Sequence, residues 1–547
     1  MSKLGAKAMN NKNIAIKNLD YLGLVAGMIN QLDIVRVIDT IISSDKNKKL
    51  LSFGTLCKAM ILNGLGYVNK QLYLTHRFFE DKPLQRLFGI DIDASMINDD
   101  ALGRTLDALY EYGVTEAYSK IALEAMSKLS LSPKTLHLDS TSFHVDGKYN
   151  SGKEKNDSVV HLVPGYSRDY HPELNQVVLN LIVEYQSAIP LWMKPSDGNQ
   201  SDSKAFASIV KEHVSSLQKV YTDDMVLIAD AALYTANTLE AMREQKLSFI
   251  SRVPASIKEV KALQNRASTL EFKSIDENYQ AFKHTIIYGD IEQQWVLYKS
   301  AHAKNKEDKT LSKNILKESQ TELKSLLKLT KSIFYCEADA HMALEAFSSN
   351  LKWITLDNMQ IINKEIFKGK GRRAKDATAD EIHYRIEATA TMNIDTLHNT
   401  SQSQSGLFIL ATNQLELSAS ELLERYKSQQ RVERGFRFLK SPEFLCDALY
   451  LKKPKRIEAL LMIMTLSLMV YAALEYTIRK ELKKNNQTFP NQVGKQINNP
   501  TTRWVFESFF AIHLLITHDN PNMVIGLLLR HKIILDVLGK HYWNFYR

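Results

Sequence analysis

The order of strand-like and helix-like segments between residues 134 and 253 constrains the fold of this 547-residue chain more than any other feature. Three strand-like runs come first, and a helix, a strand, a second helix and a last strand follow. Strands are expected at Lys134–Val145, Gln176–Tyr185, Ile189–Lys194, Met225–Asp230 and Ser248–Val253, and helices at 202–218, with Asp202 as N-cap, and at 236–245. The second and third strands are close enough to form a hairpin, and the fourth, MVLIAD, has the composition of a strand covered on both faces. This order predicts an α/β core with a mixed sheet.

The chain is too long for one hydrophobic core, so two to four domains are expected. Residues 255–405 differ from their surroundings in composition and in the order of predicted elements. They contain strand-like pieces, a lysine-rich helical stretch and the basic loop Lys368–Lys375, and they are expected to form an inserted domain. The full division is a helical N-terminal region over 1–130, core parts over 131–254 and 406–480 on either side of the insertion, and a helical C-terminal region over 481–547. The N-terminal region is expected either to bind DNA ends or to pack on the core. It contains no clear helix-turn-helix motif that would decide between these two roles.

The charge balance, 70 Lys and Arg against 61 Asp and Glu, favours a polyanionic partner. Three dispersed cysteines support neither a disulfide framework nor a cysteine zinc site, and no signal peptide is visible, so a cytoplasmic location is expected. The uncharged run Ala459–Leu474 is shorter than the roughly 20 residues that span a bilayer. It is expected to be a buried core helix, and no membrane partner is expected.

Ala419–Lys440 is predicted to be one amphipathic helix, because it has no proline and its apolar residues recur at helical spacing. At ~100° per residue, one face carries a single acid among potential hydrogen-bond donors. That face comprises Tyr426, Gln429, Gln430, Glu433, Arg437 and Lys440. Alone, such a face is also typical of an ordinary solvated surface with mixed charge.

Two further acids stand where a fold can place catalytic carboxylates: Asp139 in the middle of the first strand and Asp230 at the end of the fourth. Each has a structural alternative, since Asp139 could be a hydrogen-bonded strand acid and Asp230 could cap the turn that follows. Together with Glu433 they would offer oxygen ligands to two Mg²⁺ ions, the arrangement that stabilises phosphodiester cleavage and transfer.

The segments HLDSTSFHVDGKY, VLIADAALYTANTL and YKSQQRVERGFRFLK resemble the three acidic motifs of DDE transposases of bacterial insertion sequences. More narrowly, the third resembles the signature Tyr-x2-Arg-x3-Glu-x6-Lys, with Tyr426, Glu433 and Lys440 at the matching spacings. The resemblance implies a ribonuclease H-like core with a strand-rich insertion between the second and third acids. It also implies two Mg²⁺ or Mn²⁺ ions and cut-and-paste transposition.

Carried over by position, Asp139, Asp230 and Glu433 would be catalytic metal ligands, and Tyr426 and Lys440 would contact phosphates of the transposon end. The chain departs from the signature at one position, where Gln429 replaces Arg. The charge missing there would come from one of three neighbours on the same segment, Arg431, Arg434 or Arg437.

The leading hypothesis is a transposase that binds the terminal inverted repeats of its own element, cuts the 3′ ends and joins them to target DNA. Its partners would be double-stranded DNA and a second copy of the chain, because two ends must be brought together. Arg372 and Arg373 of the basic loop are expected to contact DNA, against the alternative of an exposed, protease-sensitive loop. A nuclease with the same core but no joining activity, and a catalytically inactive DNA-binding relative, remain open.

Overall fold

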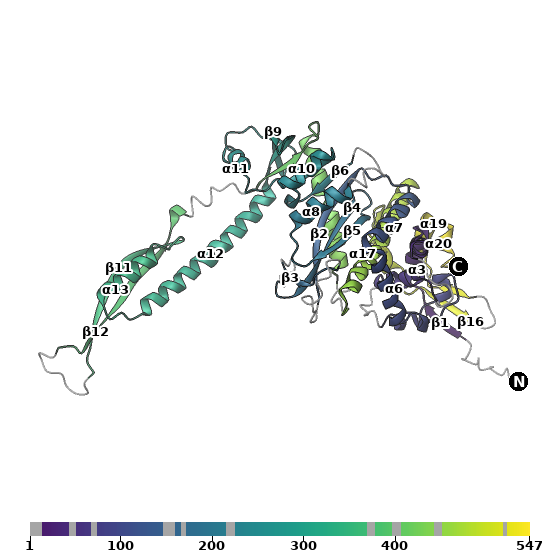
Figure 1. Ribbon diagram of the computed structural model, residues 1–547, viewed down its shortest axis with the longest axis horizontal. Coiled ribbons are helices and arrows are strands. Elements are labelled where there is room, and N and C mark those ends of the chain that lie inside the picture. The colour runs from purple at the N-terminus through teal and green to yellow at the C-terminus, as the bar shows by residue number, and fades with distance from the viewer. Residues whose placement is uncertain are drawn as a thin grey trace, which may run out of the picture. The chain divides into compact units, whose positions relative to one another are not determined.

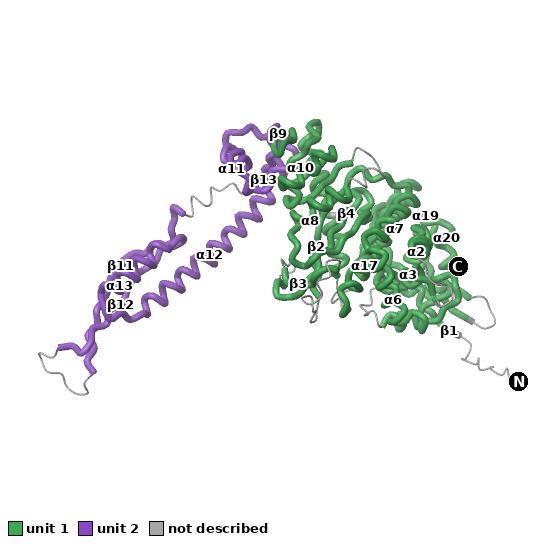
Figure 2. The backbone as a smooth tube through the Cα atoms, in the orientation of Figure 1, with its two compact units in different colours: residues 1–252, 286–294, 411–547 green, residues 253–285, 295–410 purple. Residues whose placement is uncertain are grey.

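The computed structural model describes residues 14–42, 51–66, 74–145, 159–165, 171–214, 225–368, 378–396, 406–441, 451–517 and 522–547. The chain divides into two compact units, coloured separately in Figure 2. Unit 1 comprises residues 1–252, 286–294 and 411–547, and unit 2 comprises residues 253–285 and 295–410. The predicted insertion, 255–405, lies largely in unit 2, but residues 286–294 belong to unit 1.

A mixed sheet forms the core of unit 1 (Figure 1). Its strands are β2 (Thr135–Val145), β4 (Asn175–Glu184), β5 (Pro190–Asp197), β6 (Val226–Ala229) and β7 (Ser248–Arg252), with the short β3 (Val163–Pro164) beside β4. β5, β4 and β2 are antiparallel neighbours, and β6 and β7 continue the sheet parallel to β2. The order β5-β4-β2-β6-β7 with these directions is that of a ribonuclease H-like core, which confirms the predicted fold class.

Helices cover this sheet and bury its apolar side chains. They are α8 (Asp202–Ile209), α10 (Ala236–Glu244), α15 (Ala419–Lys427), α16 (Gln430–Leu439) and α17 (Pro454–Lys484). α15 packs against β6 and β7, α16 against β2, and α17 against β5. Among the described residues, α17 alone is long and apolar enough to cross a membrane, but 94% of its most apolar window is buried in the protein. The prediction of a buried core helix in this region is therefore confirmed.

The N-terminal region is helical, as predicted, apart from the strand β1 (Ile14–Asn18). Its helices are α1 (Leu22–Gln31), α2 (Ile34–Ile41), α3 (Phe53–Gly64), α4 (Thr75–Phe79), α5 (Leu84–Phe88), α6 (Asp99–Tyr112) and α7 (Val114–Lys128). The periodicity of apolar residues predicts one helical run over Leu22–Ile42 and another over Ala101–Leu129, and each is split in two. Asp33, in the left-handed region at φ 60°, separates α1 from α2, and Gly113, at φ 102°, separates α6 from α7.

The C-terminal region contains more strand than predicted. Its elements are β14 (Phe489–Pro490), β15 (Gln496–Ile497), α18 (Thr502–Ser508), β16 (His513–Thr517), β17 (Met523–Ile525), α19 (Leu529–Leu538) and α20 (Lys540–Trp543). β16 pairs with β1 from the other end of the chain and with β17. Local sequence patterns do not reveal this pairing, because its partners are about 500 residues apart.

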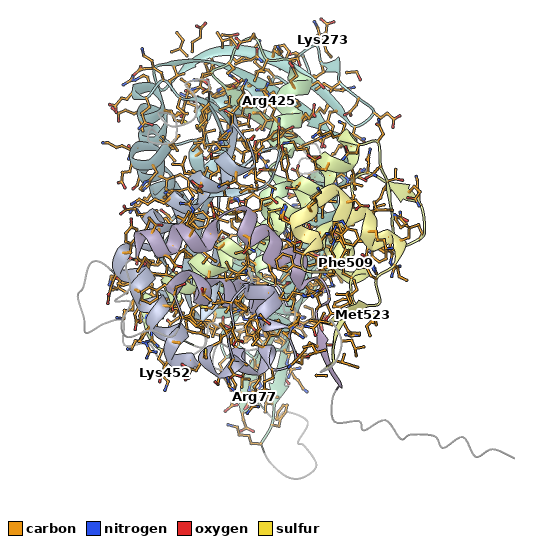
Figure 3. All side chains as sticks on the ribbon, turned by 90° about the vertical axis from the view of Figure 1, so that its right-hand side faces the viewer. Arg77, Lys273, Arg425, Lys452, Phe509 and Met523 are labelled. Atoms are coloured by element: carbon orange, nitrogen blue, oxygen red, sulfur yellow. The ribbon has the colours of Figure 1, made fainter. Side chains whose placement is uncertain are left out.

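Aromatic side chains join the two ends of the chain. The Tyr546 hydroxyl donates to the Asp20 carbonyl at 2.7 Å, and the Tyr542 hydroxyl donates to the Gln31 amide oxygen at 2.8 Å. Phe509, seen among the C-terminal elements in Figure 3, is fully buried, and its ring centroid is 5.5 Å from that of Tyr546. α17 packs against α1, α3 and α6 as well as β5, so it links these terminal elements to the sheet.

Unit 2 holds a long helix and a two-stranded ribbon (Figure 1). Its elements, three of whose strands extend into unit 1, are α11 (Lys258–Asn265), β8 (Lys273–Ser274), β9 (Tyr279–Tyr288), β10 (Ile291–Ser300), α12 (Ala301–Lys331), α13 (Glu337–Ser348), β11 (Ile354–Ile366), β12 (Glu381–Met392) and β13 (Leu407–Thr412). Glu322 on α12 accepts hydrogen bonds from the Trp353 and Ile354 amides, which fixes α12 to the start of the ribbon. The predicted inserted region thus contains, in addition to its strands, the helix α12 of 31 residues.

Candidate active site

Asp139 and Asp230 lie side by side on neighbouring strands. Leu138 of β2 is in register with Ala229 of β6, and the strands are parallel, so the next residue of each, Asp139 and Asp230, is adjacent to the other. Neighbouring strands are about 4.8 Å apart. Asp139 is only 5% exposed, and burying a carboxylate without compensation is costly. The sheet therefore brings two of the three predicted acids together at the point where β6 ends.

Asp230 has the structural role that the sequence left open. Its Oδ1 accepts a hydrogen bond from the Ala232 amide at 2.9 Å, which caps the short 3₁₀ turn Ala231–Leu233. Its backbone carbonyl accepts a hydrogen bond from the Ser251 hydroxyl of β7, also at 2.9 Å. A carboxylate offers about four lone-pair sites on its two oxygens, so capping and metal binding are compatible. The two contacts hold Asp230 in a defined orientation.

Asp139 is linked to Asp202, for which the sequence pattern favoured a role as a helix cap over a direct part in the active site. Asp139 Oδ1 accepts from the Ser140 amide at 2.8 Å, and the Ser140 hydroxyl donates to Asp202 Oδ1 at 2.5 Å. The prediction of Asp202 as N-cap is wrong by one residue, since Ser201 is the N-cap and Asp202 opens α8. The only sequence signal for Asp202 was its place in a polar turn, which does not reveal a contact with β2.

The predicted single helix over 419–440 is two helices. α15 ends at Lys427 and α16 begins at Gln430, and the Ser418–Glu421 capping box fixes the start of α15. At the junction, the Ser428 hydroxyl donates to the Arg425 carbonyl and lies 3.0 Å from His137 Nε2 of β2. A serine that bonds the preceding turn competes with the helical backbone pattern, and the contact with the fully buried His137 holds the junction against the sheet.

Tyr426, on α15, lies within electrostatic reach of all three predicted acids. Burial raises the pKa of Tyr426 to about 12, Arg252 opposes this rise, and the carboxylates of Asp230, Glu433 and Asp139 add to it. The Tyr426 hydroxyl therefore interacts electrostatically with acids from β2, from the end of β6 and from α16. Its hydroxyl stays protonated at neutral pH and can donate a hydrogen bond.

Glu433 is the least constrained of the three acids. It is exposed in the first turn of α16, and its carboxylate has no hydrogen-bond or ion-pair partner among the described residues. Within the described ranges, no three His, Cys, Asp or Glu side chains are close enough together to hold a metal ion. The donor set nevertheless suits Mg²⁺ or Mn²⁺, because two adjacent aspartates and a nearby glutamate that is free to turn supply only oxygen ligands.

The other residues predicted to bind DNA fall into separate places. Lys440 Nζ lies 5.7 Å from the centre of the Phe143 ring of β2, so Lys440 is on the sheet side of α16. Gln429 is 9% exposed, and a contact with phosphate would require its side chain to swing outward. Arg434 and Arg437 line a cavity between α16 and α17.

The Arg431 side chain lies outside the described part of the structure, as do Arg372 and Arg373. The predictions for these three residues have no structural counterpart.

Two families of known sequences match the chain. A family described as "Transposase DDE domain" matches residues 131–470, and a "Domain of unknown function (DUF4277)" matches residues 14–123. No curated protein matches the chain in sequence. Among solved structures, a cryo-EM structure of the piggyBac transposase synaptic complex with hairpin DNA is similar at 10% identity with a TM-score of 0.37, covering 90% of this chain and 79% of that chain.

Proposed function

The chain belongs to the transposase family with a DDE domain, which matches residues 131–470, and from this premise we propose that it moves the DNA element that encodes it. It binds the terminal inverted repeats of that element, cleaves the 3′ ends with water as nucleophile and joins the resulting 3′-hydroxyls to target DNA. The same carboxylates serve both steps, since only the attacking oxygen changes. The element is an insertion sequence, the transposase works in the bacterial cytoplasm, and a dimer brings the two ends together.

Asp139, Asp230 and Glu433 hold the divalent ions, Mg²⁺ or Mn²⁺. Two such ions, when bound, activate the attacking oxygen and stabilise the leaving oxygen. Asp139 and Asp230 form the fixed part of the site, because their strands set their separation. Glu433, exposed on α16, completes the ligand set by turning toward them.

Tyr426 and Lys440 position the DNA end. The Tyr426 hydroxyl, protonated at neutral pH, donates a hydrogen bond to a phosphate oxygen. Lys440, held near Phe143 on the sheet side of α16, supplies a positive charge beside the scissile strand. The observation that carries the proposal is the parallel register of β2 and β6, which brings Asp139 beside Asp230.

The test is strand cleavage by single-residue variants on a duplex whose inverted repeat is taken from the DNA flanking the reading frame. Asp139→Ala, Asp230→Ala and Glu433→Ala should each lower cleavage and joining by at least about a thousandfold, because removing one ligand removes charge stabilisation worth several kcal/mol. Binding to the same duplex should change little, since it depends on many phosphate contacts. Glu424→Ala, an exposed acid on α15, is the matched control and should retain full activity.

Three results would count against the proposal. Cleavage by any one of the three variants within tenfold of wild type would remove that residue from the site. Cleavage without joining under all conditions, with Mn²⁺ as well as Mg²⁺, would indicate a nuclease. A protein that binds the repeat but cuts nothing would be an inactive relative.

A further inference from the structure

α16 also borders a second feature, a cavity that Asp139, Asp230 and Glu433 do not line. A cavity of about 710 Å³ opens between α16, α17, the start of α18 and the β4–β5 turn at Gln186–Ala188. Arg434, Arg437 and Phe438 of α16 line it, whereas Glu433 does not. A Cβ on Gly435 would lie 3.2 Å from Leu468 Cδ2, so the glycine allows α16 to approach α17 closely at the cavity wall.

The walls of this cavity are strongly basic. Among the described residues, one acid, Glu475, lines it together with six cationic side chains, Arg434, Arg437, Arg479, Lys480, Lys483 and Arg503. Two of the six have carboxylate partners: Arg479 pairs with Glu475 at 2.8 Å, and Arg503 pairs with Glu507 at 3.2 Å. The Thr502 amide also donates to Glu475, and the Arg479 guanidinium donates to the Pro500 carbonyl at 2.9 Å, so these hydrogen bonds fix the start of α18 to α17.

The remaining four cations have no carboxylate partner among the described residues. Arg434, Arg437 and Lys483 are exposed and form no ion pair there, and Lys480 lies over the Tyr476 ring, 5.4 Å from its centre. Like charges held around one cavity repel one another, so the arrangement favours a bound polyanion. Both α16 and the last turns of α17 contribute, which makes the cluster a property of the fold and not of one basic run.

Aromatic rings form the floor of the cavity. Phe438 of α16 stacks on Tyr471 of α17, with ring centroids 4.3 Å apart and planes 29° apart. Burial raises the pKa of Tyr471, so its hydroxyl is neutral, and it accepts a hydrogen bond from the Arg503 amide at 3.1 Å. Tyr476 adds a third ring nearby. Aromatic faces bind bases and sugars without sequence preference, and cations bind the phosphates between them.

We propose that this cavity between α16 and α17 is a second DNA-binding site, which takes a nucleotide unit with its phosphate on Arg434, Arg437, Lys480 and Lys483 and its base or sugar against Tyr471 and Tyr476. The volume is within the range of about 300–1,000 Å³ that holds small-molecule-sized groups, which includes one nucleotide. The inference rests on the proposed function for the identity of the polyanion as DNA. The site is distinct from the carboxylate site in its lining, which includes none of Asp139, Asp230 and Glu433.

The experiment measures binding of the full chain to a fluorescent duplex of about 30 base pairs in EDTA, so that cleavage plays no part. Removing one cation that neutralises a phosphate should make the slope of log K against log salt less steep by about 0.9. The wild-type protein loses affinity by some factor when the salt rises from about 50 to about 200 mM. That factor should be about 3.5 times smaller for Lys483→Ala and about 12 times smaller for Lys480→Ala/Lys483→Ala. Lys484→Ala is the matched control, because this neighbouring lysine lies 3.6 Å from Glu481 and does not line the cavity. It should bind with the wild-type slope.

A second readout identifies what enters the cavity. The duplex is substituted with 5-iododeoxyuridine, cross-linked by light, and the attached peptide is mapped. Cross-links at Tyr471 or Tyr476 support the proposal, and cross-links found only elsewhere overturn it. Competition by ATP or inorganic phosphate at concentrations near those of the duplex would mean a free-nucleotide or phosphate site, and equal competition by polyglutamate would mean an acidic protein partner. Either result overturns DNA as the ligand.

These outcomes are separable from those for the proposed function. Wild-type salt slopes in Lys483→Ala and in the double variant, in a protein that still cleaves its ends, would refute the cavity site alone. Reduced slopes with mapped cross-links, in a protein that cleaves nothing, would refute the proposed catalytic function alone.

Discussion

Glu458 on α17 should limit the stability of the protein above neutral pH. It is 7% exposed, and its carboxylate accepts a hydrogen bond from the Val160 amide at 2.9 Å. Burial raises the pKa of Glu458 from 4.5 to about 7, with a smaller contribution from the nearby Asp197 carboxylate and an opposing one from the Val160 bond. Folding therefore favours the protonated acid.

The magnitude follows from the size of the pKa shift. A rise from 4.5 to about 7 corresponds to about 3 kcal/mol at about 1.4 kcal/mol per unit. Because the folded pKa is the higher one, Glu458 costs nothing below pH 4.5, and its cost grows as the pH rises and is complete above pH 7. Glu458→Gln keeps an oxygen for the Val160 amide and cannot ionise. It should leave the free energy of unfolding unchanged near pH 4.5 and raise it by up to about 3 kcal/mol near pH 8.

Urea unfolding followed by circular dichroism, at about pH 5 and about pH 8, measures this difference. Glu481→Gln is the control, since Glu481 on the same helix is only partly buried and pairs with Lys484 at 3.6 Å. It should change stability by less than about 0.5 kcal/mol at both pH values. Equal stabilisation by Glu458→Gln at both pH values would show that any gain comes from packing and would refute the titration argument. A decrease in stability at pH 8 would mean that the charged form makes a favourable contact.

Two further substitutions test how the fold holds the site. Ser428→Ala removes the hydroxyl that lies 3.0 Å from His137 Nε2 at the α15–α16 junction, and it should lower the free energy of unfolding by about 1–3 kcal/mol and reduce cleavage, with Ser428→Thr retaining more of both. A variant as stable as wild type would show that the junction does not depend on this contact. Gly27→Ala places a Cβ 2.6 Å from the Tyr542 ring, so it should lower stability by about 1–3 kcal/mol, measured by thermal unfolding, and Tyr542→Phe in the same background should not restore it. Normal stability of Gly27→Ala would mean that the two ends of the chain pack less tightly than described.

The core fold could be predicted from the sequence because its signals are local. The strand runs Lys134–Val145 and Met225–Asp230 were visible from their composition, and the observed β2 and β6 fall within them. The strand order was not local information, but it followed from resemblance to a family with a ribonuclease H-like core. The two breaks at Asp33 and Gly113 were missed because helical periodicity continues across them, whereas a single residue in the left-handed region ends a helix.

The sequence by itself predicted which residues would carry the chemistry: two acids at fixed places on strands, a third on a helix with Tyr426 and Lys440, and a surplus of positive charge. Tertiary structure alone decided which of them face one another. The parallel register of β2 and β6 places Asp139 beside Asp230, and the junction at Ser428 breaks the predicted helix, so facing directions could not be carried from Tyr426 to Arg437 by counting residues. The packing of α16 against α17 places Arg434 and Arg437 around the same cavity as Lys480 and Lys483, which come from a distant segment. Residue type sets what a side chain can do locally, but its neighbours come from strand register and helix packing, which depend on contacts between residues far apart in the chain.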